Sequence, residues 1–245
     1  MALTSINTEY DGFLNIGFKG RKLFEIPDEV LTDGDGNEYT TVVIGSQEWS
    51  VENLRSTSYM DGTAIPTASS WSNSLATYCW YNNTTDETLR QKYGALYSWQ
   101  VVNPDNPKQI APEGWRVPTD ADWTALEDYL IANGFNWDGT TEGNKIGKAL
   151  ASSGGEWDPH GTVGNIGNDQ GSNNSSGFNV LPGGYRLTNG IFTGQGGRAA
   201  FWSSTTNPDD PGKAFLRILY SFFSTVGKTF DMYRAGYSVR LVRDI

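Results

Sequence analysis

The last part of the sequence is a series of short β-prone segments separated by turn residues. Each is rich in aliphatic or aromatic residues and is bounded by Gly, Asn or Pro. The segments are residues 178–181, 185–187, 200–204, 214–220, a stretch around Val226, and 237–242. Runs of this length with such boundaries predict antiparallel strands joined by short connections. An all-helical fold is therefore not expected.

The best-marked helix precedes these segments and begins after Thr119. The Thr119 side chain is suited to cap the first turn, and Asp120 and Asp122 suit the positive end of the helix dipole. Gly134 is placed to end the helix. One apolar face is expected, formed by Trp123, Leu126, Tyr129 and Leu130.

Other local patterns complete the expected secondary structure. Apolar residues at helical spacing predict a helix over 93–102, and a short helix is expected over 144–152. Residues 154–176, rich in Gly, Asn, Ser and Asp, are expected to form a loop. Near the start, 40–44 is a predicted strand followed by a turn at Gly45. Helices between an initial hairpin and a set of terminal strands define an α+β fold.

The start of that hairpin also resembles a calcium loop. Asp33, Asp35 and Asn37 have the alternating spacing of the first EF-hand ligands. The Gly and the bidentate Glu that complete such a loop are missing, so a plain turn is the better interpretation.

Composition limits the function classes. The chain of 245 residues carries a net charge of −10, and no basic stripe is visible that would bind nucleic acid phosphates. No run approaches 18 apolar residues, so direct membrane insertion is not expected, and the first residues lack the pattern of a signal peptide. Nine Trp and 29 Gly predict many turns around an irregular aromatic core.

Catalytic chemistry has few candidates. Cys79 is the only Cys and His160 the only His, so Cys79 is expected to be a buried apolar side chain and His160 a solvated loop residue. Carboxylate pairs exist at Asp120 with Asp122 and at Asp209 with Asp210. The first pair suits a helix terminus and the second a polar turn, so the chain is not expected to be an enzyme.

Several motifs together resemble the Fibrobacter succinogenes major paralogous domain family. They are DGDGNEYTTVVIGSQEWSVENL (33–54), YGALYSW (93–99), APEGWRVPTDADW (111–123), GFNVLPGGYR (177–186), FWSST (201–205) and GYSVRLVRD (236–244). The resemblance implies a C-type-lectin-like α+β fold over 31–245, with two main helices, short antiparallel strands and long loops. Residues 1–30 lie outside it and are interpreted as an extension or a segment that docks to a neighbouring chain.

The resemblance also bears on cofactors. The related oxidases of this fold use a pair of cysteines, which a chain with one Cys cannot supply. Calcium-dependent lectins of the fold carry Glu-Pro-Asn or Gln-Pro-Asp and a later Trp-Asn-Asp, whereas 202–204 reads Trp-Ser-Ser here. No cofactor is therefore expected, and calcium held by the Asn-rich loop 165–174 is the minority alternative.

The segment 214–235 is the expected contact surface. Strand alternation places apolar residues on both faces, so one apolar face is expected to meet water or a partner. The resemblance extends to variable proteins of diversity-generating retroelements, whose last strands and loops are diversified. The predicted ligand-binding set is Phe215, Leu216, Ile218, Tyr220, Phe222, Phe223, Gly227, Thr229, Phe230, Asp231, Tyr233 and Ala235, with Lys228 and Met232 fixed. Its expected centre is Tyr220, Phe222, Phe223, Phe230 and Tyr233.

These features favour a non-catalytic protein that binds a protein or glycan receptor on another cell. It would act outside the cell, on a bacterial surface or a phage particle. Three alternatives stay open: the Phe residues close a second small core, the chain is an enzyme of the same fold that uses carboxylates or a metal, or it is a structural or fimbrial subunit that assembles through residues 1–30.

Overall fold

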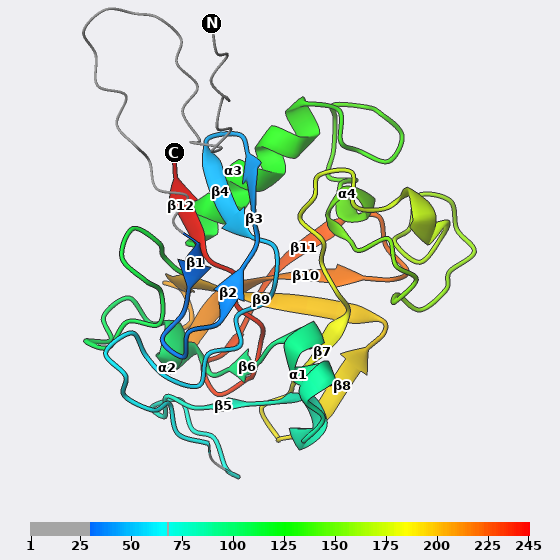
Figure 1. The fold of residues 1–245 in the computed structure, drawn as a ribbon. Coiled ribbons are helices and arrows are strands. Elements are labelled where there is room, and N and C mark those ends of the chain that lie inside the picture. Colours follow the sequence, from blue (N-terminus) through cyan, green and yellow to red (C-terminus); the bar gives the residue numbers. More distant parts are fainter. Residues whose placement is uncertain (1–29, 68) are drawn as a thin grey trace, which may run out of the picture.

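The computed structural model describes residues 30–67 and 69–245 and has a mixed α/β architecture dominated by sheets (Figure 1). Its centre is a five-stranded sheet in the order β11-β10-β9-β7-β8. The strands are β7 (Gly183–Arg186), β8 (Phe192–Gln195), β9 (Arg198–Thr206), β10 (Lys213–Tyr220) and β11 (Val226–Met232). Neighbours are antiparallel except β7 and β9, which meet in parallel. The predicted strands 185–187, 200–204, 214–220 and the one around Val226 are thus found.

A three-stranded sheet joins early and late parts of the chain. It has the order β12-β4-β3, with β3 (Thr41–Ile44), β4 (Gln47–Ser50) and β12 (Val242–Asp244). The predicted turn lies between β3 and β4, where Gly45 has φ +66, a conformation that favours glycine. The expected strand over 237–242 is mostly wrong, because continuous pairing begins at Val242 and Tyr237 forms only an isolated bridge.

Two small hairpins complete the sheets. β1 (Leu31–Thr32) pairs with β2 (Glu38–Tyr39), and β5 (Tyr78–Cys79) pairs with β6 (Leu96–Tyr97). Between β1 and β2, the Asp33 carboxylate accepts hydrogen bonds from the backbone N–H groups of Asp35 and Asn37 at 2.9 and 3.0 Å. Asp33 therefore closes a plain turn, as the sequence interpretation favoured.

The helix after Thr119 is confirmed as α3 (Asp120–Ala132). Thr119 and Asp122 form a capping box, in which each side chain bonds the backbone N–H of the other residue. Trp123, Leu126 and Leu130 are buried beneath it. Tyr129 is 41% exposed, so the apolar face is narrower than predicted.

The other helices are short. They are η1 (Tyr81–Asn83), α1 (Glu87–Tyr93), α2 (Trp99–Val102), α4 (Gly147–Leu150) and η2 (Gln170–Ser172). The predicted helix over 93–102 is wrong in its first half, because Gly94 has φ +71 and the following residues form β6 against β5. The short helix expected over 144–152 is a single turn, and 178–181 is no strand, since only Val180 bridges to Ala151.

Two aromatic cores lie on opposite sides of the central sheet. Trp202 on β9 belongs to the core that contains Tyr97, and its indole N–H donates to the carbonyl of Tyr97 at 2.8 Å. The adjacent Phe201 belongs to the core of Trp49 and Trp123. Neighbouring residues of one strand therefore serve two cores, as strand alternation requires.

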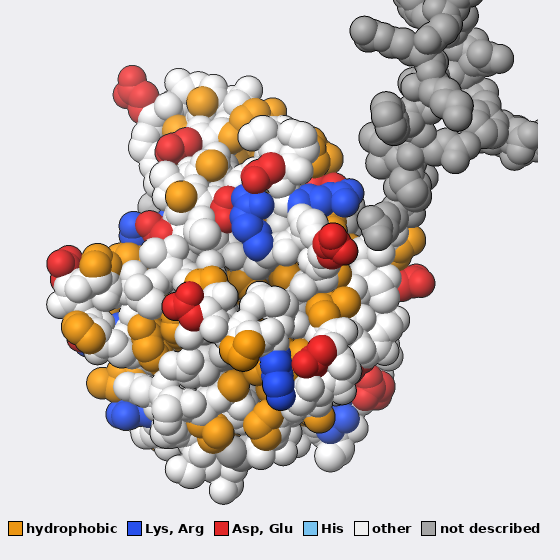
Figure 2. Space-filling view, turned by 90° about the vertical axis from the view of Figure 1, so that its left-hand side faces the viewer, with side chains coloured by type: hydrophobic (Ala, Val, Ile, Leu, Met, Phe, Trp, Pro, Cys, Tyr) orange, Lys and Arg blue, Asp and Glu red, His pale blue; other side chains and the backbone are white. Residues whose placement is uncertain are grey.

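The interpretation of residues 1–30 as a docking segment falls, except for Val30, outside the described residues. In the described part of the chain, no helix has both the length and the hydropathy required to span a bilayer. The face in Figure 2 shows interspersed acidic and basic side chains with small hydrophobic groups between them.

Candidate binding surface

The predicted contact segment forms a long hairpin at one edge of the central sheet. β10 and β11 are in register from the pair Lys213 with Met232 to the pair Leu219 with Val226. The connection between the strands lies at the right-hand side of Figure 1. Backbone hydrogen bonds hold this connection in place. Phe223 N–H donates to the carbonyl of Tyr220, and Ser221 N–H donates to the carbonyl of Gly197. The turn is therefore held by the adjoining β8–β9 connection.

Three aromatic rings gather at this turn, and we call Tyr220, Phe222 and Phe223 the aromatic tip. The ring centroids of Phe222 and Phe223 are 4.7 Å apart, and those of Tyr220 lie 5.2 and 5.6 Å from them. Phe222 is 37% exposed and Phe223 49% exposed. The rings contact one another and still present apolar surface to solvent, so they do not form a closed core.

Residues distant in sequence support the aromatic tip. The His160 ring lies 6.5 Å from that of Phe222, and Asn165 Nδ2 donates to the carbonyl of Phe222 at 2.7 Å. On the other side, the Arg198 guanidinium lies 5.3 Å above the Tyr220 ring and donates to the Tyr185 hydroxyl at 2.8 Å. Neither His160 nor Arg198 was expected at the site, because nothing local in the sequence links them to it.

Phe230 belongs to a different part of the hairpin. It lies directly opposite Phe215, their ring centroids are 6.4 Å apart, and Phe230 is 43% exposed. The ammonium groups of Lys228 and Lys213 cover the rings of Phe215 and Phe230 at 4.6 and 5.2 Å. Phe215 precedes Tyr220 by five residues, so the two project from opposite faces of β10 about 17 Å apart.

Tyr233 occupies a third place. Its ring stacks on that of Trp99 with centroids 4.3 Å apart and planes at 19°. The nearby Asp231 carboxylate accepts a hydrogen bond from the Tyr237 hydroxyl at 2.7 Å. The expected single centre is thus divided among the aromatic tip, the Phe215 and Phe230 pair, and the Tyr233 stack.

Three residues of the predicted set are buried. Leu216 is 1% exposed, Ile218 7% and Ala235 0%, and all three belong to the core of Trp202. The prediction that these three residues bind a ligand is therefore wrong, because their side chains lie inside the core. The other accessible members are Gly227, half-buried above Ile218, and the exposed Thr229.

The second face of β10 is covered too. Arg217 is 1% exposed and forms ion pairs with Asp120 at 2.7 Å and Glu127 at 2.5 Å, both on α3. The expectation that one apolar face of this strand meets water or a partner is therefore wrong in mid-strand. The middle of β10 therefore offers no contact surface, whereas Phe222 and Phe223 in the turn and Thr229 and Phe230 on β11 are exposed.

A family model described as the Fibrobacter succinogenes major domain matches residues 42–243. The chain belongs to this family. The match runs from β3 to β12 and includes the whole β10–β11 hairpin with the aromatic tip. No curated protein and no solved structure matches the chain.

The Asn-rich loop of this Fibrobacter succinogenes major domain uses its amides internally. Asn165 Nδ2 lies 3.0 Å from His160 Nδ1, and Asn168 Nδ2 donates to the carbonyl of His160 at 3.3 Å. Asn173 Nδ2 donates to the carbonyls of Ser152 and Ile166. Across the described residues no group of three or more His, Cys, Asp or Glu side chains is arranged to hold a metal ion. These amides brace the loop behind the aromatic tip.

The carboxylate pairs noted in the sequence have structural partners. Asp122 accepts from Arg116 and caps α3, while Asp120 pairs with Arg217 and Lys228. Asp210 pairs with Lys213 at 2.5 Å. Cys79 is buried, and burial raises the pKa of its thiol to about 12, so the reactive thiolate is scarce at neutral pH.

Proposed function

We propose that this chain is a non-catalytic receptor-binding protein whose main contact surface is the aromatic tip. The observation that carries the proposal is the cluster itself. Three rings in mutual contact, two of them more than a third exposed, stand at the braced end of a paired hairpin. Soluble proteins seldom leave adjoining large aromatic side chains in water without a contact for them.

The physical advantage of such a tip lies in its low entropic cost. Phe and Tyr have two side-chain torsions each, so a partner that covers them orders few bonds for a large apolar area. The backbone is already fixed by Asn165 and by the hydrogen bond from Ile166 N–H to the carbonyl of Phe223 at 3.1 Å. The partner proposed is a protein or glycan on another cell, and the site of action a bacterial surface or phage particle.

We also propose that the fold is C-type-lectin-like and that the hairpin is diversified by a retroelement. Supporting the fold, α1 and α3 are the only helices longer than four residues in the described chain, and strands near its two ends meet in one sheet. The accessible members of the predicted set are the positions at which diversity would change recognition. The coding DNA tests this, because a nearby template repeat must carry adenines at those codons.

The binding proposal is tested by replacing Phe222 and Phe223 with Ser. Binding to arrayed glycans and to displayed bacterial surface proteins should be lost, because the exposed rings supply the contact area. The melting temperature should change by only about 2 °C, since exposed substitutions cost about 0.5 kcal/mol.

Ile191→Ser is the matched control, because Ile191 is 58% exposed and lies in the β7–β8 connection, away from the aromatic tip. The Ile191→Ser protein should bind the same glycans and surface proteins as the wild-type protein. Unchanged binding by the Phe222→Ser, Phe223→Ser protein would refute the assignment of the tip, and a large loss of stability would assign both rings to a core.

A further inference from the structure

Two adjoining cavities lie beside α1 and η1. The first reaches Gln195 of β8, and the second is bounded by β5 and by Thr67 and Ser69. The first has a volume of about 290 Å³ and the second about 530 Å³. Trp80 and Arg90 line both, so they form a partition between the cavities. We call the pair of cavities the α1 groove. None of the predicted contact residues lines it.

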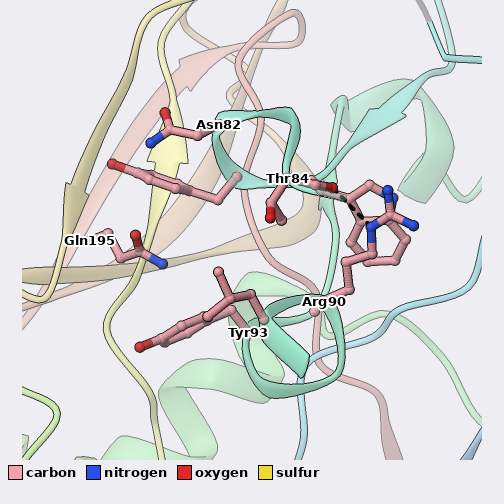
Figure 3. Close-up of a pocket in the computed structure, with 9 residues that line it drawn as sticks. Asn82, Thr84, Arg90, Tyr93 and Gln195 are labelled. Atoms are coloured by element: carbon pink, nitrogen blue, oxygen red, sulfur yellow. Dashed lines mark hydrogen bonds between the residues drawn. The ribbon is translucent and has the colours of Figure 1, made fainter. Parts of the chain in front are cut away.

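The first cavity combines aromatic walls with amide side chains. Its walls include Trp80, Tyr81 and Tyr93, and its polar side chains are Asn82, Thr84, Arg90 and Gln195. Figure 3 shows the Asn82 and Gln195 side chains on one side of the cavity and Arg90 beside Thr84 on the other. The ring of Tyr81 is held edge-on by Phe192 of β8 at 5.4 Å.

Glycines of the 177–186 motif shape this wall. Gly184 has φ +69, and a Cβ atom there would lie 2.6 Å from Cε2 of Tyr81. A Cβ on Gly183 would lie 3.5 Å from Cδ1 of Tyr93. The first contact is too short for a side chain and the second is an ordinary van der Waals contact, so it is the glycine at 184 that lets the Tyr81 ring approach the sheet edge.

The polar groups of the cavity are available to a ligand. Within the described residues, the side chains of Asn82 and Gln195 make no hydrogen bond, nor do the hydroxyls of Tyr81 and Tyr93. Arg90 is oriented by a 2.9 Å bond from Nε to the carbonyl of Thr84 and by stacking 5.1 Å from Trp80. An amide offers both donors and an acceptor in one plane, which suits two neighbouring hydroxyl groups.

The backbone aims neighbouring amides into neighbouring cavities. Asn82 and Asn83 both have φ +51, an uncommon left-handed conformation for residues other than Gly. Asn82 lines the first cavity and Asn83 the second. Each cavity is therefore lined by one Asn residue, and Trp80 and Arg90 lie between the two cavities.

We propose that the α1 groove binds a neutral oligosaccharide, with a sugar ring in each cavity. A pyranose has an apolar C–H face that fits an aromatic ring and a rim of hydroxyls that fits amides. The first cavity is at the lower end of the size range of small-molecule sites, which suits one ring. The net charge of −10 disfavours anionic sugars, and Arg90 is already paired with Glu87 at 3.6 Å.

The groove binds sugar without cleaving it. Cleavage of a glycosidic bond ordinarily needs two carboxyl groups beside the bond. No Asp or Glu is among the described residues that line either cavity. This proposal is independent of the aromatic tip, because the two sites share no residue.

The test measures binding of neutral trisaccharides, namely cellotriose, maltotriose, mannotriose and N-acetylchitotriose. Trp80 lines both cavities, so a bound sugar should change Trp fluorescence saturably, and calorimetry should give the same Kd. Asn82→Gly keeps the left-handed backbone accessible, and Gln195→Ala removes an exposed amide. Each should weaken binding about fivefold to tenfold through lost hydrogen bonds.

Gln91→Ala is the matched control, because Gln91 is exposed on α1 and does not line the groove. It should bind as wild type does, and so should the Phe222→Ser, Phe223→Ser protein, which separates this proposal from that of the aromatic tip. Failure of all four sugars to bind would overturn the proposal. So would equal loss in the control, or saturable binding of trigalacturonate or a peptide with no binding of the neutral sugars.

Discussion

At the residue scale, Asp122 shows how one side chain serves several elements. Its carboxylate accepts hydrogen bonds from Arg116, from the backbone and hydroxyl of Thr119, and from Gln47 on β4. Burial acts to raise the pKa of Asp122, but the bonds from Arg116 and Thr119 outweigh it, so the pKa lies below the usual 3.8. The charged form is therefore favoured by folding.

Asp122→Asn should lower the free energy of unfolding at pH 7 by about 1 to 2 kcal/mol, through the weakened cap and the lost charge. The wild-type contribution is fully present above the unfolded pKa of 3.8 and is lost as pH falls through the lower folded pKa. The variant should therefore show a smaller fall in stability as pH falls below about 4. Urea unfolding at pH 7, 5, 4 and 3 measures this.

The control for this prediction is Asp105→Asn, since Asp105 is exposed and its side chain makes no hydrogen bond within the described residues. Its unfolding curve should follow that of the wild type at every pH. An equal pH dependence in Asp122→Asn and wild type would contradict the role given to Asp122.

At the element scale, β10 is held from both faces. Leu216 and Ile218 pack into the core of Trp202, and Arg217 between them reaches α3 on the other side. The Glu127 side chain is 14% exposed, and its partial burial raises its pKa although Arg217 opposes the shift. The strand carries the aromatic tip at its end, so this double anchoring fixes the place from which the tip projects.

Arg217→Met should reduce the free energy of unfolding by about 3 kcal/mol, because it leaves the largely covered Glu127 carboxylate without its cation. The double variant Arg217→Met, Glu127→Leu should recover part of this loss, since no isolated charge remains in the interior. Guanidinium chloride unfolding of the wild type and both variants gives the comparison. A double variant less stable than Arg217→Met would show that the ion pair is not the source of the loss.

At the scale of the whole molecule, Arg240 ties together three distant stretches of chain. It is 1% exposed and donates to the carbonyls of Ser50, Val51, Phe178 and Asn179 and to Oδ1 of Asn53. Burial lowers the pKa of Arg240 to about 9, which still leaves it charged at neutral pH. The guanidinium thus donates hydrogen bonds to carbonyl oxygens at the place where the end of β4, the loop before β7 and the C-terminal residues meet.

Arg240→Lys should cost about 3 kcal/mol, because an ammonium group cannot reach acceptors arranged around a planar fork. Trp fluorescence during urea unfolding measures the change, since Trp49 lies in the adjoining core. Arg234→Lys is the control, because the half-buried Arg234 side chain has no hydrogen bond or ion pair within the described residues. Similar losses in the two variants would contradict the bridging role.

The sequence by itself determined the features that depend on neighbours a few residues away. These are the capped start of α3 at Thr119, the turn at Gly45, the plain turn at Asp33 and the strands β9, β10 and β11. The family also follows from such local motifs. In each case the responsible groups, a capping oxygen, a flexible glycine or an alternating run, are close in the chain.

Only the tertiary structure decided where distant segments meet. Leu96 and Tyr97 belong to the run 93–102, whose apolar residues have helical spacing. They nevertheless form a strand, because β5 lies beside them and pairs with them. The predicted contact residues all lie within 215–235 of the sequence. In the structure they are divided among the core of Trp202, the aromatic tip, the Phe215 and Phe230 pair, and the Tyr233 stack. The first cavity of the α1 groove combines residues of 80–94 with Gln195, and no local pattern in the sequence predicted it. Pairing and burial depend on what lies opposite in space, and that is set by the whole chain.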